Sequence, residues 1–356
     1  MTTGTNSFSC HGSSPVHTNQ PKKDVNVAFK DGICYTPPYS ENSDEEWEYQ
    51  PHPNLYETLA AGVLDHYDNY KNGEINRTSM PTYLYVGRPG TGRSRNASEF
   101  SRSVKSAIAS HTQHPLHVEL TQRLKTDFVF RISFEGVTAL KEEELSSPMN
   151  AIGVRMLHQL LDLPFSYIRS SYVAHPIDVF RLVAAATNLD IYNEFTGILV
   201  IDNFQDALGR LASNEDSFYE MLTQINSSLV SRPAEIKGKT PVKSPFIITC
   251  VTATRIDPRR DCSFNAHCKR VYLPLNQLDL PVWNDDHNPV ATYSPIARRL
   301  VKDVGGHPKA MEILVNELNK YDDGLPPSED EDEVSTAVHT RLDKRYREAV
   351  EWCKDQ

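Results

Sequence analysis

Apolar and polar residues follow two different periods along the middle of the chain. Short, unbroken apolar runs are typical of strands buried on both faces of a sheet, and apolar residues at every third or fourth position are typical of amphipathic helices. The strand-like runs are residues 82–87, 127–136, 197–202, 245–253 and 269–275. The helix-like segments among them include residues 151–161, 175–190 and 217–231. This succession predicts an α/β fold, a three-layer sandwich whose mostly parallel sheet has helices on both faces.

Helical periodicity also precedes and follows these strands. Before them, Leu55, Leu59, Val63 and Tyr67 recur at helical spacing, and Gly73 follows as a stop signal. After them, two helix-like segments, residues 293–304 and 308–321, are joined by a Gly-Gly-His turn. We therefore expect the α/β domain to be followed by a small helical domain.

Composition changes at both ends of the chain and suggests the domain limits. The first 52 residues are rich in Ser, Thr, Asn and Pro and lack periodicity, which predicts a disordered arm. We expect the α/β domain over residues 53–275, the small, lid-like helical domain over 276–323, and an acidic linker with a charged helix over 324–356.

Charge and cysteine usage narrow the class of protein. The net charge is −10, and residues 41–48 and 329–333 hold many of the acids, which argues against direct binding to nucleic acid or to an anionic membrane surface. The six cysteines are scattered rather than arranged as a disulfide framework. The chain shows no signal peptide and no apolar run long enough to cross a bilayer. We expect a cytoplasmic or nuclear protein without a membrane partner.

The strongest chemical motif is the sequence GRPGTGRS at residues 87–94, directly after the first strand-like run. It matches the phosphate-binding loop pattern G-x-x-x-x-G-K-[ST] except that Arg93 replaces lysine. In such a loop the backbone N–H groups converge on phosphate oxygens, and the serine hydroxyl binds Mg²⁺. The predicted nucleotide-binding residues here are Gly87, Gly90, Thr91, Gly92, Arg93 and Ser94. The alternative interpretation is a glycine-rich turn between a strand and a helix.

Two later strand ends supply groups that complete such a site. The run at 197–202 ends in Asp202, which we predict to bind the metal together with Ser94. The run at 245–253 is followed by Thr254 and Arg255, and we expect Arg255 to approach the terminal phosphate. Ligands of open α/β sheets bind at the carboxyl ends of strands, where these residues fall. A plain surface turn explains the Thr254–Arg255 pair almost as well.

In this order, the segments YVGRPGTGRS, FVFRISFEG, GILVIDNFQDAL, VTATR, KRVYLPL and GGHPKAMEIL resemble the P-loop NTPase module of Crinkler and retrotransposon hot spot proteins, which belong to the STAND group. The resemblance covers roughly residues 55–320. It implies ATP and Mg²⁺ as ligands and a strand between the loop strand and the Asp202 strand. It also implies that Pro308 opens the small helical domain over the nucleotide, although a plain helix start explains Pro308 equally well. Crinkler-type targeting sequence and a nuclease-like domain are not recognisable.

Departures from the family pattern leave the chemistry open. Arginine is planar and bulkier than lysine, so Arg93 can hold phosphate without following the charge that develops during transfer. Asn203 stands where relatives carry an acid, and we consider Glu135 a candidate catalytic base beside Arg93 and Asp202, with a surface acid equally plausible. Three functions compete: a slowly hydrolysing ATP-dependent switch, a degenerate nucleotide-binding module that acts by protein contact, and another chemistry such as a nucleotide-using transferase. A protein partner or a homo-oligomer is expected in the first two.

Overall fold

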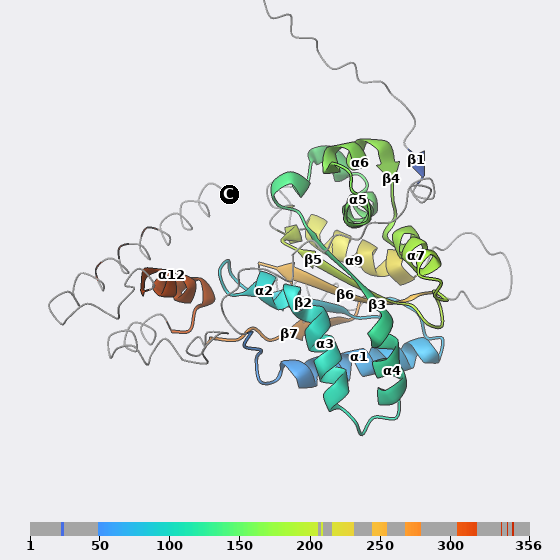
Figure 1. Cartoon of the computed structure of the whole chain (residues 1–356), viewed down its shortest axis with the longest axis horizontal. Helices are drawn as coiled ribbons and strands as arrows, with labels where there is room; N and C mark the ends of the chain where they lie inside the picture. The colour runs from blue at the N-terminus through green and yellow to red at the C-terminus, as the bar shows by residue number, and fades with distance from the viewer. Residues whose placement is uncertain are drawn as a thin grey trace, which may run out of the picture.

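The computed structural model describes residues 23–24, 49–205, 208, 216–230, 244–254, 268–278 and 305–318, together with Thr336, Thr340 and Lys344. Its centre is a five-stranded sheet in the order β3-β5-β6-β2-β7, in which all four pairs of neighbouring strands are parallel (Figure 1). The strands are β2 (Thr82–Val86), β3 (Asp127–Ser133), β5 (Thr196–Asp202), β6 (Phe246–Ala253) and β7 (Arg270–Leu273). The predicted α/β class and all five predicted strands are confirmed.

Helices cover both faces of the sheet, as the unbroken apolar strands predicted (Figure 1). One face packs against α1 (Leu55–Lys71), α3 (Phe100–Ser110) and α4 (His117–Arg123). The other face packs against α5 (Pro148–Leu160), α6 (Phe165–Ser171), α7 (Pro176–Ala186) and α9 (Asp216–Val230). Every residue of β5 and β6 is buried, because each of these strands contributes side chains to both apolar clusters. Leu55, Leu59, Val63 and Tyr67 face the sheet from α1 and are fully buried.

The register of the strand pairs places the carboxyl ends of four strands side by side at one end of the sheet. β6 lies between β2 and β5, which confirms the expected intervening strand. Val86 pairs with Ala253, and Ser133 pairs with Asp202. The last residues of β2, β3, β5 and β6 therefore end at one level, and the segments that follow them emerge side by side.

Shorter elements surround this core. They are α2 (Arg93–Ser98), α12 (Pro308–Leu318), the 3₁₀ turns η2 (Leu124–Thr126), η3 (Gly136–Thr138) and η4 (Glu142–Glu144), and the two-residue strands β1 (Lys23–Asp24) and β4 (Tyr172–Val173), which pair with each other. The helical pattern of residues 93–110 is in fact two helices, because Glu99 separates α2 from α3. None of the described helices has the length and apolar character needed to cross a membrane.

The ends of the fold differ in part from the sequence-based limits. Tyr49 lies within the expected disordered arm, yet its hydroxyl donates a hydrogen bond to Asn96 Oδ1 on α2 at 2.8 Å. The Gln50 carbonyl accepts one from Asn276. The packed domain therefore includes the last residues of that arm. Of the small helical domain, α12 is described, while the predicted helix at 293–304 and most of the C-terminal charged helix lie outside the described residues.

Candidate functional site

The loop of residues 87–94 connects β2 directly to α2 and has the backbone of a tight, glycine-dependent turn. Gly90 and Gly92 have φ values of 81° and 83°, in the left-handed region that favours glycine. Gly92 is the N-cap residue of α2, so this helix starts at Arg93. Thr91 closes a turn onto the Arg88 carbonyl, with its hydroxyl at 2.7 Å from that oxygen. The strand–loop–helix arrangement expected for a phosphate loop is therefore present.

The start of α12 lies against this loop. The Lys309 N–H donates to the Gly90 carbonyl at 3.2 Å. A methyl group on Gly90 would stand 2.9 Å from the His307 ring, and one on Gly92 would stand 3.3 Å from Pro308 Cγ. Pro308 is the first residue of α12, a position that suits its fixed φ and missing N–H. The segment that we predicted to open the helical domain thus covers the loop.

Arg93 points from the loop toward the neighbouring strand. Its side chain is only 6% exposed, and Nη1 donates to Thr254 Oγ1 at 3.2 Å, directly after β6. The Thr254 N–H in turn donates to Gln205 Oε1 at 2.6 Å, beyond the end of β5. These contacts tie the loop to the ends of β6 and β5. They also show that part of the donor capacity of Arg93 is directed at protein.

Asp202 ends β5 as a buried carboxylate held by two donors. The Thr252 hydroxyl donates to its Oδ1 at 2.6 Å, and the Asn203 N–H approaches the same oxygen at 3.1 Å. The Asn203 N–H also lies 3.0 Å from Thr252 Oγ1. Thr252 therefore acts on Asp202, and it is Thr254 that faces the loop. Oδ2 of Asp202 has no hydrogen-bond partner among the described residues.

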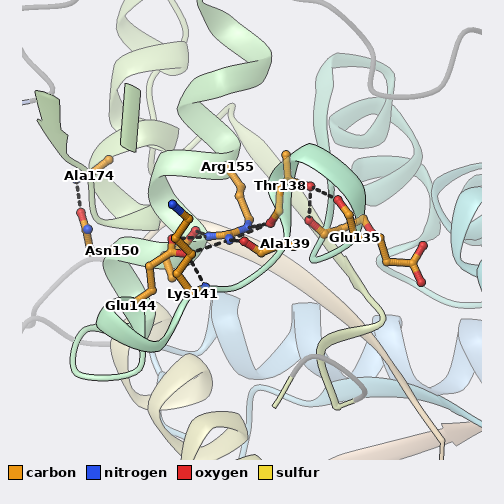
Figure 2. A network of polar contacts seen from close by, with 10 residues as sticks. Glu135, Thr138, Ala139, Lys141, Glu144, Asn150, Arg155 and Ala174 are labelled. Atoms are coloured by element: carbon orange, nitrogen blue, oxygen red, sulfur yellow. Dashed lines mark hydrogen bonds and ion pairs between the residues drawn. The ribbon is translucent and has the colours of Figure 1, made fainter. Parts of the chain in front are cut away.

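Glu135 lies two residues beyond β3, next to the end of β5. Its Oε1 accepts a hydrogen bond from Asn203 Nδ2 at 2.8 Å. Asn203 adopts a left-handed φ of 55°, a conformation that asparagine tolerates better than most residues, and there its amide reaches this acid. Figure 2 shows the Glu135 carboxylate pointing away from the cluster around Arg155. The Glu135 carboxylate therefore lies next to Asn203, the residue that follows Asp202.

Ser94 and Asp202, the predicted metal-binding residues, carry oxygen atoms of the kind that magnesium prefers. Ser94 is exposed in the first turn of α2, and α2 contacts both β5 and β6. One hydroxyl, one carboxylate and phosphate or water oxygens are the hard ligands that Mg²⁺ takes at nucleotide sites. No group of three His, Cys, Asp or Glu side chains among the described residues forms a closed metal cage. Arg255 lies outside the described residues.

Two supporting residues were missed by sequence reasoning. Gln205 anchors the Thr254 N–H, and Asn96 donates to the Gly92 carbonyl at 2.9 Å while accepting from Tyr49. Each uses its side-chain amide to bond a residue far away in the sequence, the backbone of Thr254 for Gln205 and the Tyr49 hydroxyl for Asn96. A one-dimensional pattern contains no signal for such contacts.

Comparison with known proteins identifies a distant relative. The chain is 27% identical over 290 residues to Crinkler effector protein 108 of Phytophthora sojae. The match covers 79% of this chain and 33% of that protein, so the chain spans about a third of the length of its curated relative. No protein-family model matches the chain. The chain is therefore a distant homologue of a Crinkler effector.

Solved structures show low overall similarity. The Aeropyrum pernix ORC2 protein in its ADP form gives a TM-score of 0.40 at 14% identity, covering 84% of this chain and 71% of that chain. PCH-2 of C. elegans gives 0.44 at 14% identity, covering 88% and 77%. The parallel sheet and the glycine-rich loop between β2 and α2 are the features that make the fold P-loop NTPase-like.

Proposed function

We propose that the chain is an ATP-binding module of the STAND type, in which slow ATP hydrolysis drives a conformational switch. The observation that carries this proposal is the convergence of four segments at the carboxyl end of the sheet. The loop contacts Thr254 through Arg93, Asp202 lies on the next strand, and Asn203 connects it to Glu135. Open α/β sheets bind their ligands at this end, just beyond the carboxyl ends of the strands.

Each group has a distinct task in this proposal. The loop amides and the start of α2 bind the phosphates, and Arg93 adds positive charge. Ser94 and Asp202 would hold Mg²⁺, which neutralises charge on the phosphate oxygens when it is bound. Glu135, oriented by Asn203, accepts the proton of the attacking water. Asn203 donates a hydrogen bond and has no basic group, so the general base is assigned to Glu135.

Pro308 and its neighbours make the proposed switch plausible. Because α12 contacts Gly90 and Gly92 directly, a phosphate held by the loop would meet the first residues of this helix. A change in the bound nucleotide would then change the position of α12 relative to the loop. A protein partner or a second copy of the chain would respond to that movement, as the STAND resemblance implies.

Calorimetry with the full chain tests nucleotide binding. We expect ATP with Mg²⁺ to bind, and we expect Ser94→Ala to weaken that binding at least tenfold. Ser98→Ala is a matched control on the same helix, because the Ser98 hydroxyl donates locally to the Arg95 carbonyl. Asp202→Asn should abolish phosphate release. A folded protein that ignores millimolar ATP, GTP and ADP alike would refute the proposal.

The burial of Arg93 supports a second candidate, a nucleotide-binding module without turnover. An arginine held at Thr254 Oγ1 is less free to follow phosphate charge than a lysine would be. Binding without phosphate release identifies this case. Arg93→Lys then separates the causes: a gain in rate shows that the loop has lost activity, and an unchanged rate shows that arginine replaces lysine adequately.

A further inference from the structure

A hollow of about 680 Å³ lies beside the outer edge of β3. It is formed by the second half of that strand, by residues 135–138 of the following loop, by the last turns of α5 and by residues 161–163 directly after this helix. Figure 2 shows this loop and α5 around Arg155. Among the described strands β3 is an outermost strand of the sheet, so its outer edge has no neighbouring strand there. The hollow touches Glu135 and otherwise uses residues to which the proposed nucleotide site gives no role.

Three of the residues that line it each have a buried side-chain atom without a hydrogen-bond partner among the described residues: Arg131 Nε, Ser133 Oγ and Gln159 Oε1. Gln159 is only 7% exposed, and its Nε2 donates to the Arg131 carbonyl at 2.6 Å, which fixes the amide at the strand edge. Buried polar atoms of native proteins nearly always have partners. A donor, an acceptor and a hydroxyl around one space call for a ligand that offers both kinds of group.

The charges around the hollow argue against an anionic ligand. Arg155 is bonded to both oxygens of Glu144, at 2.8 and 3.1 Å, so its charge is already neutralised. Burial lowers the pKa of His158, which leaves that ring uncharged at neutral pH. The other charged residues of the lining are Arg131 and two acids, Glu135 and Asp162.

A nucleobase is also a poor match. Proteins hold bases mainly by stacking them on aromatic rings, and none of the residues that line the hollow is Phe, Tyr or Trp. The rim instead exposes aliphatic side chains to solvent. Val137 is 83% exposed and Leu163 is 38% exposed. Exposed aliphatic groups around buried hydrogen-bonding atoms are suited to a peptide, which carries an N–H, a C=O and apolar side chains together.

We propose that this hollow binds a short extended segment of a partner protein, neutral or basic in charge. Its backbone amides bond to Arg131, Ser133 and Gln159, and an apolar side chain packs between Val137 and Leu163. This inference does not depend on nucleotide binding. Because Glu135 belongs to both sites, peptide binding would also act next to the proposed catalytic base.

Selection from a phage-displayed library of random heptapeptides tests the proposal. The immobilised full chain is the target, and the double variant Val137→Asp/Leu163→Asp serves for counter-selection. Enriched sequences are synthesised with a fluorophore, and binding is followed by anisotropy. We expect Val137→Asp to weaken binding at least tenfold. Val118→Asp is the matched control, since Val118 is 75% exposed on α4, outside the hollow, and should change affinity less than twofold.

Two further measurements examine the interior of the hollow. Gln159→Met should weaken the same peptides at least fivefold, and backbone N-methylation of the peptide should abolish binding. If Gln159→Met fails to fold, the exposed rim variants decide the question. The proposal is overturned if no peptide is enriched over the counter-selected variant, or if Val137→Asp and Val118→Asp bind the selected peptides equally. Peptide binding by a chain that ignores ATP would leave this inference standing and remove the nucleotide proposal.

Discussion

Glu135 shows how the role of one residue depends on its neighbours in space. In the sequence it ends a strand-like run and could equally be a surface acid. In the structure its carboxylate accepts a hydrogen bond from Asn203, whose own N–H approaches Asp202. These two contacts place the Glu135 carboxylate next to Asn203, the residue that follows the predicted metal ligand Asp202, and we have proposed it as the general base. Removing its basicity should therefore affect turnover and spare binding.

We expect Glu135→Gln to lower the rate of phosphate release from ATP about 100-fold or more, the usual effect of losing a general base. The ATP dissociation constant should stay within threefold. Glu143→Gln is the control, because Glu143 is an exposed acid on the same β3–α5 loop. Equal rates for the two variants would exclude Glu135 as the base.

His66 provides a residue-scale test of the core. The ring is fully buried next to Phe246, and neither ring nitrogen has a partner among the described residues. Desolvation, with a smaller contribution from Lys269, lowers its pKa from 6.5 to about 3. In the unfolded chain His66 therefore takes up a proton below about pH 6.5, whereas in the folded chain it does so only near pH 3. This residue's contribution to stability is complete above pH 6.5 and is lost as the pH falls.

We expect His66→Leu to remove that pH dependence. Between pH 7 and pH 4.5, wild type should lose about 2–3 kcal/mol more unfolding free energy than the variant does. Urea denaturation at each pH measures the difference. Parallel pH profiles would show that the ring is protonated in the folded state.

At the scale of elements, a buried ion pair fixes the loop between β3 and α5. Arg155 and Glu144 are 1% and 6% exposed. The guanidinium also donates to the carbonyls of Thr138 and Ala139 (Figure 2). It further donates to the Ala151 carbonyl and lies 4.2 Å from the centre of the Phe134 ring. This cluster holds the loop three residues beyond Glu135. An intact pair gives a modest net gain, whereas a single buried charge is costly.

The single variant Glu144→Leu should therefore lower the unfolding free energy by about 3–5 kcal/mol. The double variant Glu144→Leu/Arg155→Met should recover part of that loss, because no charge remains buried alone. Recovery will be incomplete, since three backbone carbonyls lose a donor. Urea denaturation of the single and double variants gives the comparison, and a double variant less stable than Glu144→Leu would contradict this account.

The elements differ in how well a sequence can predict them. Strands such as β5 and β6 were predictable because burial on both faces requires an unbroken apolar run. The position of Asp202 followed from the strand end alone. The break at Glu99 and the short helices α4 and α6 carry weaker periodicity, and the Arg155–Glu144 pair depends on distances that no local pattern encodes. That one strand separates β2 from β5 was expected from family resemblance and not from the residues, and the rest of the strand order was not predicted.

At the scale of the whole molecule, the contact between α12 and the loop connects two segments more than 200 residues apart. It consists of the Lys309 N–H on the Gly90 carbonyl and the approach of His307 and Pro308 to Gly90 and Gly92. The glycines permit both the left-handed backbone and this closeness. Comparing substitutions that cause the same backbone strain, with and without disturbing the approach of α12 to the loop, would show whether this contact matters for nucleotide binding.

Gly90 and Gly73 make that separation possible. Both have φ near 80°, at 81° and 74°, so alanine introduces similar backbone strain at either position. Around Gly73 an added methyl meets nothing within 4 Å, whereas at Gly90 it stands 2.9 Å from His307 and 3.0 Å from Lys309. Gly73→Ala should cost about 1 kcal/mol and leave ATP affinity unchanged. Gly90→Ala should cost more and weaken ATP binding at least tenfold, because α12 must move or the loop must change shape. Denaturation and calorimetry on the two variants measure both effects, and equal ATP affinities would mean that nucleotide binding does not depend on how α12 meets the loop.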